Sequence, residues 1–223
     1  MNCKINNSNQ NNITFKTRIV FLSPKGFRKV FGAWKNKNFA NICHFDITNN
    51  ENDRFSCYKT NIKRGYTKGI KTCTAGVCVN KGEKAPLFWH IENTHANIEN
   101  FPIISNIIQG TNAIIIGSKN NYKHSKELFE KFVEEMKCKS IPTTLIQGTK
   151  HSEAHMMYES TNDALYVCIN DIYKKDNYVK SIEDLQNTCD FLKISQNDSI
   201  EFYDTLPQKT IKQSIENLIH KIF

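Results

Sequence analysis

The 223-residue chain contains no Cys-x-x-Cys pair, although it has eight cysteines, and it contains no long apolar run. The missing pair excludes a zinc ribbon and a thioredoxin-type redox motif. Because no run approaches the ~20 apolar residues of a membrane-spanning helix, no membrane span is expected. Residues 1–12 are polar and lack an apolar core, so we also expect no cleaved signal peptide.

Acidic residues are also scarce relative to basic ones, with 22 against 30, a formal net charge of +8 and a pI of about 9.0. Such a charge suits an acidic partner surface, nucleic acid or anionic lipid. However, no block of five basic residues occurs, and dispersed basic residues are typical of a solubilising surface. We therefore expect no stable nucleic-acid partner, and we expect a monomer.

Four cysteines fall inside apolar patterns, where a free thiol behaves as a small hydrophobe. They are Cys43, Cys138, Cys168 and Cys189. Free thiols favour a reducing compartment, so the expected site of action is the cytosol. Secretion into a host cytoplasm by a route that uses no cleaved signal peptide stays open.

Hydrophobic patterning predicts many strands with helices between and after them. The predicted strands are residues 17–22, 42–48, 54–60, 86–91, 112–117, 143–147, 153–159, 164–170 and 199–203, and the predicted helices are residues 27–33, 124–138, 181–189 and 207–223. Hairpins are predicted for residues 42–60 and 153–170. Residues 63–68 are predicted as a basic loop, and residues 72–80 as two strand pieces around a turn at Ala75-Gly76.

This succession predicts an α+β fold with a layered sandwich of mixed or antiparallel β-sheets and flanking helices. Residues 1–14 form a polar lead-in. Residues 15–223 form one domain, with a helical C-terminal extension from about residue 180.

One stretch, residues 72–90, carries residues suited to nucleophilic catalysis. Cys78 follows a small-residue turn, His90 comes twelve positions later at the end of an apolar run, and Thr72 lies six positions earlier. A thiol needs a base to form the attacking thiolate, and the base needs an orienting group. Two extended segments joined by a turn are expected to bring Cys78 and His90 side by side.

This Thr–Cys–His arrangement resembles the glutamine deamidase superfamily that joins CheD-type chemoreceptor deamidases, cytotoxic necrotizing factor and Burkholderia lethal factor. The spacing is most similar to that of the lethal factor. The downstream order is also similar: a strand ending in glycine, a helix, a second strand ending in glycine, and a hairpin. The resemblance covers roughly residues 17–170 and implies a sandwich of the CheD and cytotoxic necrotizing factor catalytic-domain type.

The resemblance implies a hydrolase that uses no cofactor and no metal and converts a glutamine side chain of a partner protein to glutamate. Cys78 would be the nucleophile, His90 the general base and acid, and Thr72 the group that orients the imidazole. The family includes bacterial toxins and effectors with a role in virulence. The implied partner is therefore a host protein, such as a GTPase or a translation factor.

Further residues are expected to shape this site. Gly76 permits the tight backbone that would expose the thiol, and the amides near Val77 would face a developing oxyanion. Val77 departs from the family, which places Gly or Ser before the cysteine. Trp89 and Tyr158 are candidates for lining a slot for the incoming side chain, although aromatic residues also suit a core.

Several alternatives stay open. Cys73 is a second candidate nucleophile, and His95 is a rival base. His151 and His155 have the i, i+4 spacing of a helical metal pair, but no third ligand is evident. The same thiol and imidazole would also serve a transglutaminase or a cysteine protease. A non-catalytic basic module that binds nucleic acid or acidic proteins is the alternative from another functional class.

Overall fold

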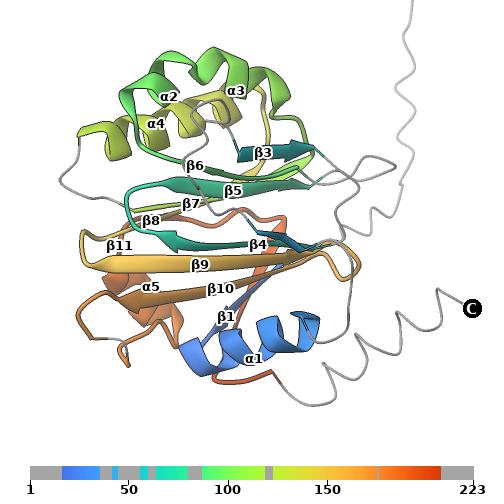
Figure 1. Cartoon of the computed structure of the whole chain (residues 1–223), viewed down its shortest axis with the longest axis vertical. Helices are drawn as coiled ribbons and strands as arrows, with labels where there is room; N and C mark the ends of the chain where they lie inside the picture. Colours follow the sequence, from blue (N-terminus) through green and yellow to red (C-terminus); the bar gives the residue numbers. More distant parts are fainter. Residues whose placement is uncertain are drawn as a thin grey trace, which may run out of the picture.

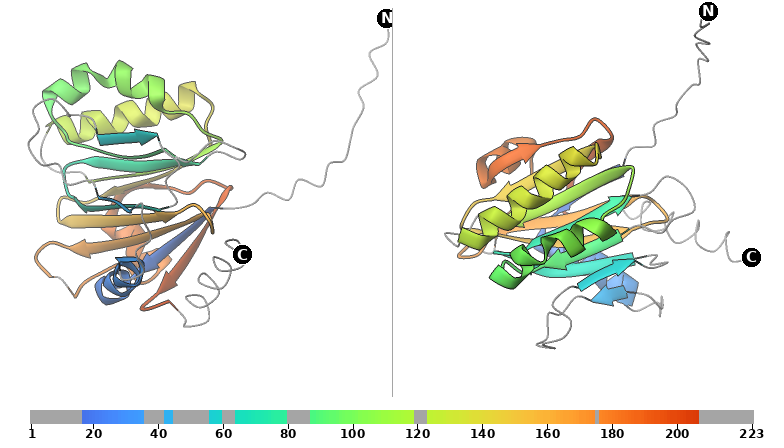
Figure 2. Two further views of the ribbon diagram at one scale, coloured as in Figure 1. Left: turned by 45° about the vertical axis from the view of Figure 1, so that its right-hand side comes forward. Right: turned by 90° about the horizontal axis from the view of Figure 1, so that it is seen from above.

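Two six-stranded β-sheets face each other in the computed structural model, and helices cover their outer faces (Figures 1 and 2). The structure describes residues 17–35, 42–44, 56–59, 64–79, 87–118, 123–174 and 176–206. Both sheets combine parallel and antiparallel strand pairs. The protein is therefore an α+β sandwich of two mixed sheets, and this confirms the predicted fold class at that level.

The first sheet, sheet A, has the strand order β12-β1-β10-β9-β4-β2. Its strands are β1 (Thr17–Leu22), β2 (Ile42–His44), β4 (Arg64–Ile70), β9 (Ser152–Glu159), β10 (Ala164–Asp171) and β12 (Asp198–Tyr203). β9 and β10 form the predicted antiparallel hairpin. β12 is an edge strand, as expected from its sequence, and β1 lies between β10 and β12, parallel to both.

The second sheet, sheet B, has the order β11-β8-β7-β5-β6-β3. Its strands are β3 (Ser56–Lys59), β5 (Thr74–Val79), β6 (Leu87–Ile91), β7 (Asn112–Ser118), β8 (Thr143–Gly148) and β11 (Cys189–Lys193). β7 and β8 are parallel and are joined through a helix, as parallel neighbours require. β5 is antiparallel to both of its neighbours, β6 and β7.

Helices lie on the outer faces of the two sheets and at one end of the sandwich (Figure 1). They are α1 (Pro24–Lys35), α2 (His95–Glu99), α3 (Phe101–Ile107), α4 (Lys123–Cys138) and α5 (Ile182–Thr188). α1 packs on sheet A, whereas α2, α3 and α4 pack on sheet B. α4 is amphipathic: Leu128, Phe129, Phe132 and Met136 are buried at helical spacing, as predicted.

Three apolar layers follow from the alternation of side chains along each strand. The central layer lies between the sheets and includes Val77 and Phe88 of sheet B with Met156 and Val167 of sheet A. The second layer lies between sheet B and its helices. The third lies between sheet A and α1. Side chains at neighbouring positions of one strand therefore enter different layers. This alternation determines which layer each candidate residue occupies.

A buried carboxyl group ties the two sheets together at one end of the sandwich. Asp198, at the start of β12, accepts hydrogen bonds from the side chains of Asn112 (2.6 Å) and Thr144, which are both in sheet B. Burial raises the pKa of Asp198, although these two hydrogen bonds act in the opposite direction. Asp198 therefore holds its proton more tightly in the folded chain than in the unfolded one.

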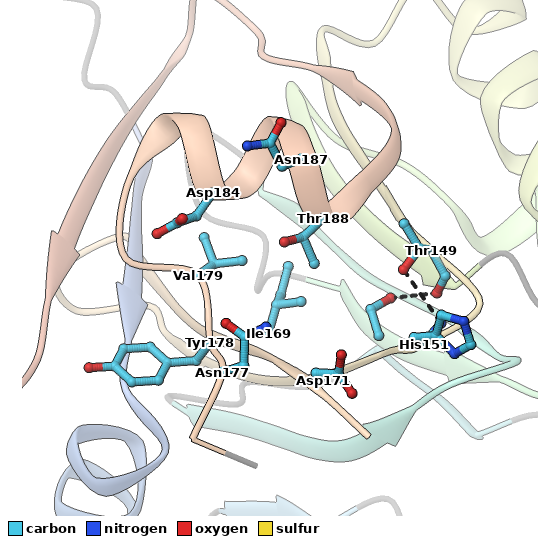
Figure 3. A pocket seen from close by; sticks show the side chains of 11 residues that line it. Thr149, His151, Ile169, Asp171, Asn177, Tyr178, Val179, Asp184, Asn187 and Thr188 are labelled. Atoms are coloured by element: carbon cyan, nitrogen blue, oxygen red, sulfur yellow. Dashed lines mark hydrogen bonds between the residues drawn. The ribbon is translucent and has the colours of Figure 1, made fainter. Parts of the chain in front are cut away.

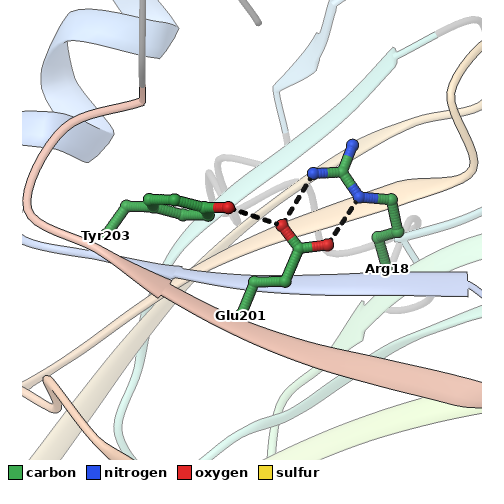
Figure 4. Close-up of polar contacts among 3 residues, drawn as sticks. All are labelled: Arg18, Glu201 and Tyr203. Carbon is green, nitrogen blue, oxygen red and sulfur yellow. Dashed lines mark hydrogen bonds and ion pairs between the residues drawn. The ribbon is translucent and has the colours of Figure 1, made fainter.

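An ion pair links the neighbouring strands β1 and β12 (Figure 4). Arg18 donates to both carboxylate oxygens of Glu201, at 2.7 and 2.8 Å, and the Tyr203 hydroxyl donates to the same carboxylate at 3.1 Å. This bidentate geometry lowers the pKa of Glu201. All three groups are partly exposed, so water screens their interaction.

Four predictions about individual elements were wrong. The described part of the loop predicted at residues 63–68 is a strand, because Arg64 begins β4 and its charge is paired with the buried Glu159. The expected turn at Ala75-Gly76 is absent, since β5 continues through it. The described parts of 42–60 form no hairpin, because β2 and β3 belong to different sheets. From residue 182 to 203 the chain contributes β11 and β12 to the two sheets, so this part is not a helical extension.

Other predicted elements are confirmed. The strands predicted at 17–22, 86–91, 112–117 and 143–147 and the helices predicted at 27–33, 124–138 and 181–189 all occur, with bounds that differ by a few residues. The predicted helix at 207–223 and the polar lead-in lie outside the described residues.

Candidate functional site

The predicted nucleophile, Cys78, lies in the layer between sheet B and its helices. Its side chain is completely buried among Leu87, Trp89 and Phe132. Sheet B covers it on one side, and α2, α3 and α4 cover it on the other. A thiol in this position packs as a core residue and is not accessible to a protein substrate.

The predicted base, His90, lies in the opposite layer, between the two sheets. Its Nδ1 atom is 2.5 Å from the hydroxyl oxygen of Thr67 on β4, so the imidazole bridges sheet B and sheet A. Its Nε2 atom is buried and has no hydrogen-bond partner among the described residues. Burial lowers the pKa of His90 to about 4, so the ring is neutral at pH 7.

The strand register explains why Cys78 and His90 do not meet. β5 and β6 are antiparallel neighbours, as expected, but Cys78 pairs with Leu87, whereas His90 pairs with Ala75. Directly paired residues share a face of the sheet, and an odd number of positions along a strand reverses the face. Cys78 and His90 therefore project from opposite faces of sheet B. The expectation that they lie side by side was wrong.

Thr72 and the residues predicted to form the oxyanion hole, Gly76 and Val77, take part in packing and in the sheet. The carbonyl of Thr72 accepts a 2.7 Å hydrogen bond from Ser125, which anchors the start of α4. A Cβ atom on Gly76 would lie 2.3 Å from the Trp89 ring, so glycine is needed there for packing and not for a turn. Val77 is completely buried between the sheets. Since β5 is hydrogen-bonded to a strand on each side, its amides belong to the sheet ladder.

The two aromatic residues predicted to line a slot lie in different layers. Trp89 stacks on Phe132 of α4, with ring centroids 5.5 Å apart, and is completely buried. Tyr158 lies between the sheets, and its hydroxyl donates to Asp163 at 2.9 Å. Trp89 and Tyr158 therefore form parts of two separate cores and do not enclose a common slot.

A different thiol and imidazole do face each other, on sheet A. Cys168 of β10 pairs directly with His155 of β9. However, burial raises the pKa of Cys168 to about 12 and lowers the pKa of His155. The Nδ1 atom of His155 accepts a hydrogen bond from the Gly69 amide, so the ring proton is on Nε2 and that nitrogen cannot accept a proton from the thiol. This pair is not an activated nucleophile.

The remaining alternatives gain no support from the side chains around them. Burial raises the pKa of Cys73 to about 11, which disfavours its thiolate. His95 is exposed and forms an ion-pair contact with Glu99 at 3.1 Å. His151 and His155 are not on a helix, and the described part of the chain holds no cluster of three or more metal-ligating side chains.

The structure instead presents a cavity of about 310 Å³ at the end of the sandwich where β8, β9, β10 and α5 meet (Figure 3). α5 carries Asp184, Asn187 and Thr188 on one side, and Asp171 and Asn177 lie on the other. The complete lining is Thr149, His151, Ser152, Ile169, Asp171, Asn177, Tyr178, Val179, Asp184, Asn187 and Thr188. Most of these side chains are polar, and two of them are carboxylates.

The two carboxylates are held by backbone amides. Oδ1 of Asp171 accepts hydrogen bonds from the amides of Tyr173 (2.7 Å) and Lys174 (3.1 Å). Oδ2 of Asp184 accepts one from the amide of Lys180 at 3.0 Å. Neither carboxylate has an ion-pair partner among the described residues. One oxygen of each carboxylate is thus oriented by backbone amides.

The local sequence explains how the wall of the cavity is built. The side chain of Ser181 accepts a hydrogen bond from the Asp184 amide at 3.0 Å and so caps α5. The segment before α5 is held to β10 by the bond from the Val179 amide to the Ile169 carbonyl, at 3.0 Å. Sequence reasoning found α5 but missed the cavity. The spacing Ser181-x-x-Asp184 signals the start of this helix, with an acid in its first turn, but it gives no signal for a cavity.

The sequence matches no protein-family model and no curated protein. Within the described residues, no helix combines the length and the apolar character needed to cross a membrane.

Proposed function

We propose that this protein is a binding domain that takes up a small cationic group in the cavity beside α5. The observation that carries the proposal is the pair of carboxylates, Asp171 and Asp184, that line one cavity without a cationic partner among the described residues. The chain as a whole has a charge of +8. Two unpaired acids at one concave site therefore stand out from their surroundings.

The lining suits an ammonium or guanidinium group on a short aliphatic stem. The free oxygens of Asp171 and Asp184 would accept charge-assisted hydrogen bonds from the cation. Ile169 and Val179 supply apolar surface for the stem. The volume of 310 Å³ is at the small end of the range for ligand sites, so the group is about the size of a basic side chain.

Calorimetric titration with L-argininamide tests this proposal, with N-acetyl-L-norleucinamide as a control ligand that has an aliphatic side chain and carries no charge. We expect binding of L-argininamide to weaken at least about tenfold in Asp171→Asn and in Asp184→Asn, since each substitution removes a charged acceptor. Glu183→Gln is the matched control, because Glu183 is an exposed neighbour on the same helix and does not line the cavity. Equal binding of both ligands, or none, would contradict the proposal.

A second candidate is thiol-dependent deamidation of glutamine in a partner protein. The observation that favours it is that Cys78 and His90 lie on antiparallel neighbouring strands within a mixed-sheet sandwich. In the arrangement described above the two side chains lie on opposite faces, so this chemistry would require β5 and β6 to shift register. Mass spectrometry of cytosolic proteins treated with the native chain or with Cys78→Ala decides it. Glutamine-to-glutamate conversion that depends on Cys78 would support deamidation, and its absence would count against it.

A further inference from the structure

A chain of side-chain hydrogen bonds connects two carboxyl groups at the end of the sandwich where β1, β7, β8 and β12 begin. Nδ2 of Asn112 donates to Oδ1 of Asp198 at 2.6 Å and also reaches the hydroxyl oxygen of Thr17 at 3.5 Å. That hydroxyl donates to Oδ2 of Asp163 at 3.0 Å, and the hydroxyl of Thr144 donates to Oδ2 of Asp198. Every donor in this chain therefore points toward a carboxyl oxygen, which suits two ionised groups.

A proton on Asp198 finds no acceptor in this arrangement. Its Oδ1 atom faces an N–H group of Asn112, and its Oδ2 atom faces the hydroxyl of Thr144. The oxygen of Thr144 already accepts a hydrogen bond from the Ser195 amide at 2.8 Å. By contrast, Oδ1 of Asn112 is buried and has no hydrogen-bond partner among the described residues. Half a turn of this amide would exchange its donor for an acceptor and present Oδ1 to the proton.

The surroundings of Asp198 favour proton uptake. Burial raises the pKa of Asp198, and so does the charge of Asp163, whereas the hydrogen bonds from Thr144 and Asn112 lower it. Thr17, which also faces this group, is uncharged and buried. As the pH falls, Asp198 therefore takes up a proton at a higher pH than a solvent-exposed aspartate does.

We propose that Asp198 and Asn112 form a two-position switch that responds to pH. When Asp198 takes up a proton from solvent, the amide of Asn112 makes half a turn and its Oδ1 accepts the hydrogen bond from the new carboxyl O–H. This oxygen then also faces Thr17, whose hydroxyl turns away from Asp163 to donate to it. Asp163 keeps only the hydrogen bond from the Tyr158 hydroxyl, at 2.9 Å, out of its two hydroxyl donors. The protonation state of β12 thus reaches the turn between β9 and β10.

The switch is independent of the proposed function. The cavity lies where β8 and β10 end, whereas the switch lies where β8 and β12 begin, at the opposite end of the sandwich. A test of the switch therefore gives the same answer whether or not the cavity binds a cation.

Nuclear magnetic resonance of the native chain, labelled with ¹⁵N and ¹³C and titrated from pH 7 to about pH 4, tests the switch. We expect the side-chain NH₂ resonances of Asn112 and the Cγ resonance of Asp198 to move with one common midpoint, above the ~3.9 of an ordinary aspartate. Asn97 is the matched control, because its amide is also buried but donates to the backbone carbonyl of Glu92 at 2.8 Å. Resonances of Asn112 that stay fixed while Asp198 titrates would overturn the proposal.

Two variants test the two halves of the switch. Asp198→Asn is an uncharged isostere of the protonated acid, so the resonances of Asn112 should match those of the native chain at low pH and should not titrate. If they match the native chain at pH 7, the amide does not turn. Thr17→Val keeps the shape of the side chain but removes the hydroxyl that links Asn112 to Asp163. In this variant Asn112 should still follow Asp198, but the response of the Asp163 Cγ resonance should fall by about half or more, since only the through-space effect of charge remains. An unchanged response of Asp163 would overturn the relay.

Discussion

The neutral imidazole of His90 gives the sharpest physical prediction. Its pKa is about 4 in the folded chain against about 6.5 for a free histidine, because burial between the sheets disfavours the charged ring. Between these two values the unfolded chain binds a proton that the folded chain does not. The contribution of the neutral His90 ring to the free energy of unfolding is therefore fully present above about pH 6.5. It is lost as the pH falls toward 4.

The magnitude follows from the size of the shift. A difference of about 2.5 pKa units corresponds to about 3 kcal/mol of unfolding free energy. This is a large part of the ~5–15 kcal/mol that stabilises an ordinary domain. His90→Gln removes the titration and keeps a side chain that can hydrogen-bond to Thr67. We expect this variant to lose much less stability than the native chain over the same pH range.

Urea unfolding, followed by circular dichroism at several values from pH 7 to about pH 4, measures the effect. The relevant quantity is the difference between native and variant, because His155 and Asp198 also titrate in the folded chain with shifted pKa values. His95→Gln is the control, since His95 is exposed. If native chain and His90→Gln lose stability in parallel, the imidazole is hydrated or charged in the folded protein and the reasoning is refuted.

Three further predictions concern packing, accessibility and the buried carboxyl group. Gly76→Ala places a methyl group against the Trp89 ring, so it should destabilise the chain by ~1–3 kcal/mol, to be measured by urea unfolding. Iodoacetamide should modify the exposed Cys138 in the native chain but modify Cys78 only in urea, and rapid labelling of Cys78 without urea would contradict the packing seen here. Because the pKa of Asp198 is raised in the folded chain, its ionisation should lower the free energy of unfolding as the pH rises above about 4. Asp198→Asn should remove this pH dependence.

The sequence was sufficient for elements whose pattern is set locally. Periodic apolar residues predicted α4, and a continuous apolar run predicted β7, because each pattern reflects burial on known faces. β4 was missed because Arg64, Gly65 and Lys68 resemble a loop. In the folded chain Glu159 neutralises Arg64, and the Phe88 ring occupies the space beside Gly65 where a side chain would be. Both partners are distant in sequence, so local reasoning could not find them.

The prediction of the catalytic site was wrong for a related reason. The residues Cys78 and His90 and the adjacency of their strands were predicted, but the register was not, and register decides which face each side chain occupies. A predicted turn at Gly76 hid the fact that β5 is continuous. The cavity beside α5 combines three segments that are far apart in the chain, including Thr149, Ile169 and Asp184. No motif in any one segment indicates that they meet.

The position of β1 has a consequence for how the chain is made. β1 comes first among the described strands, yet both of its neighbours, β10 and β12, begin more than 140 residues later, at Ala164 and Asp198. During synthesis the ribosome must therefore translate the chain through β10 before either edge of β1 can be covered. Such long-range pairing is intrinsically slow, and a chain interrupted before β12 would carry an uncovered apolar strand. Nascent copies of this chain are accordingly expected to need a chaperone until β12 has been translated.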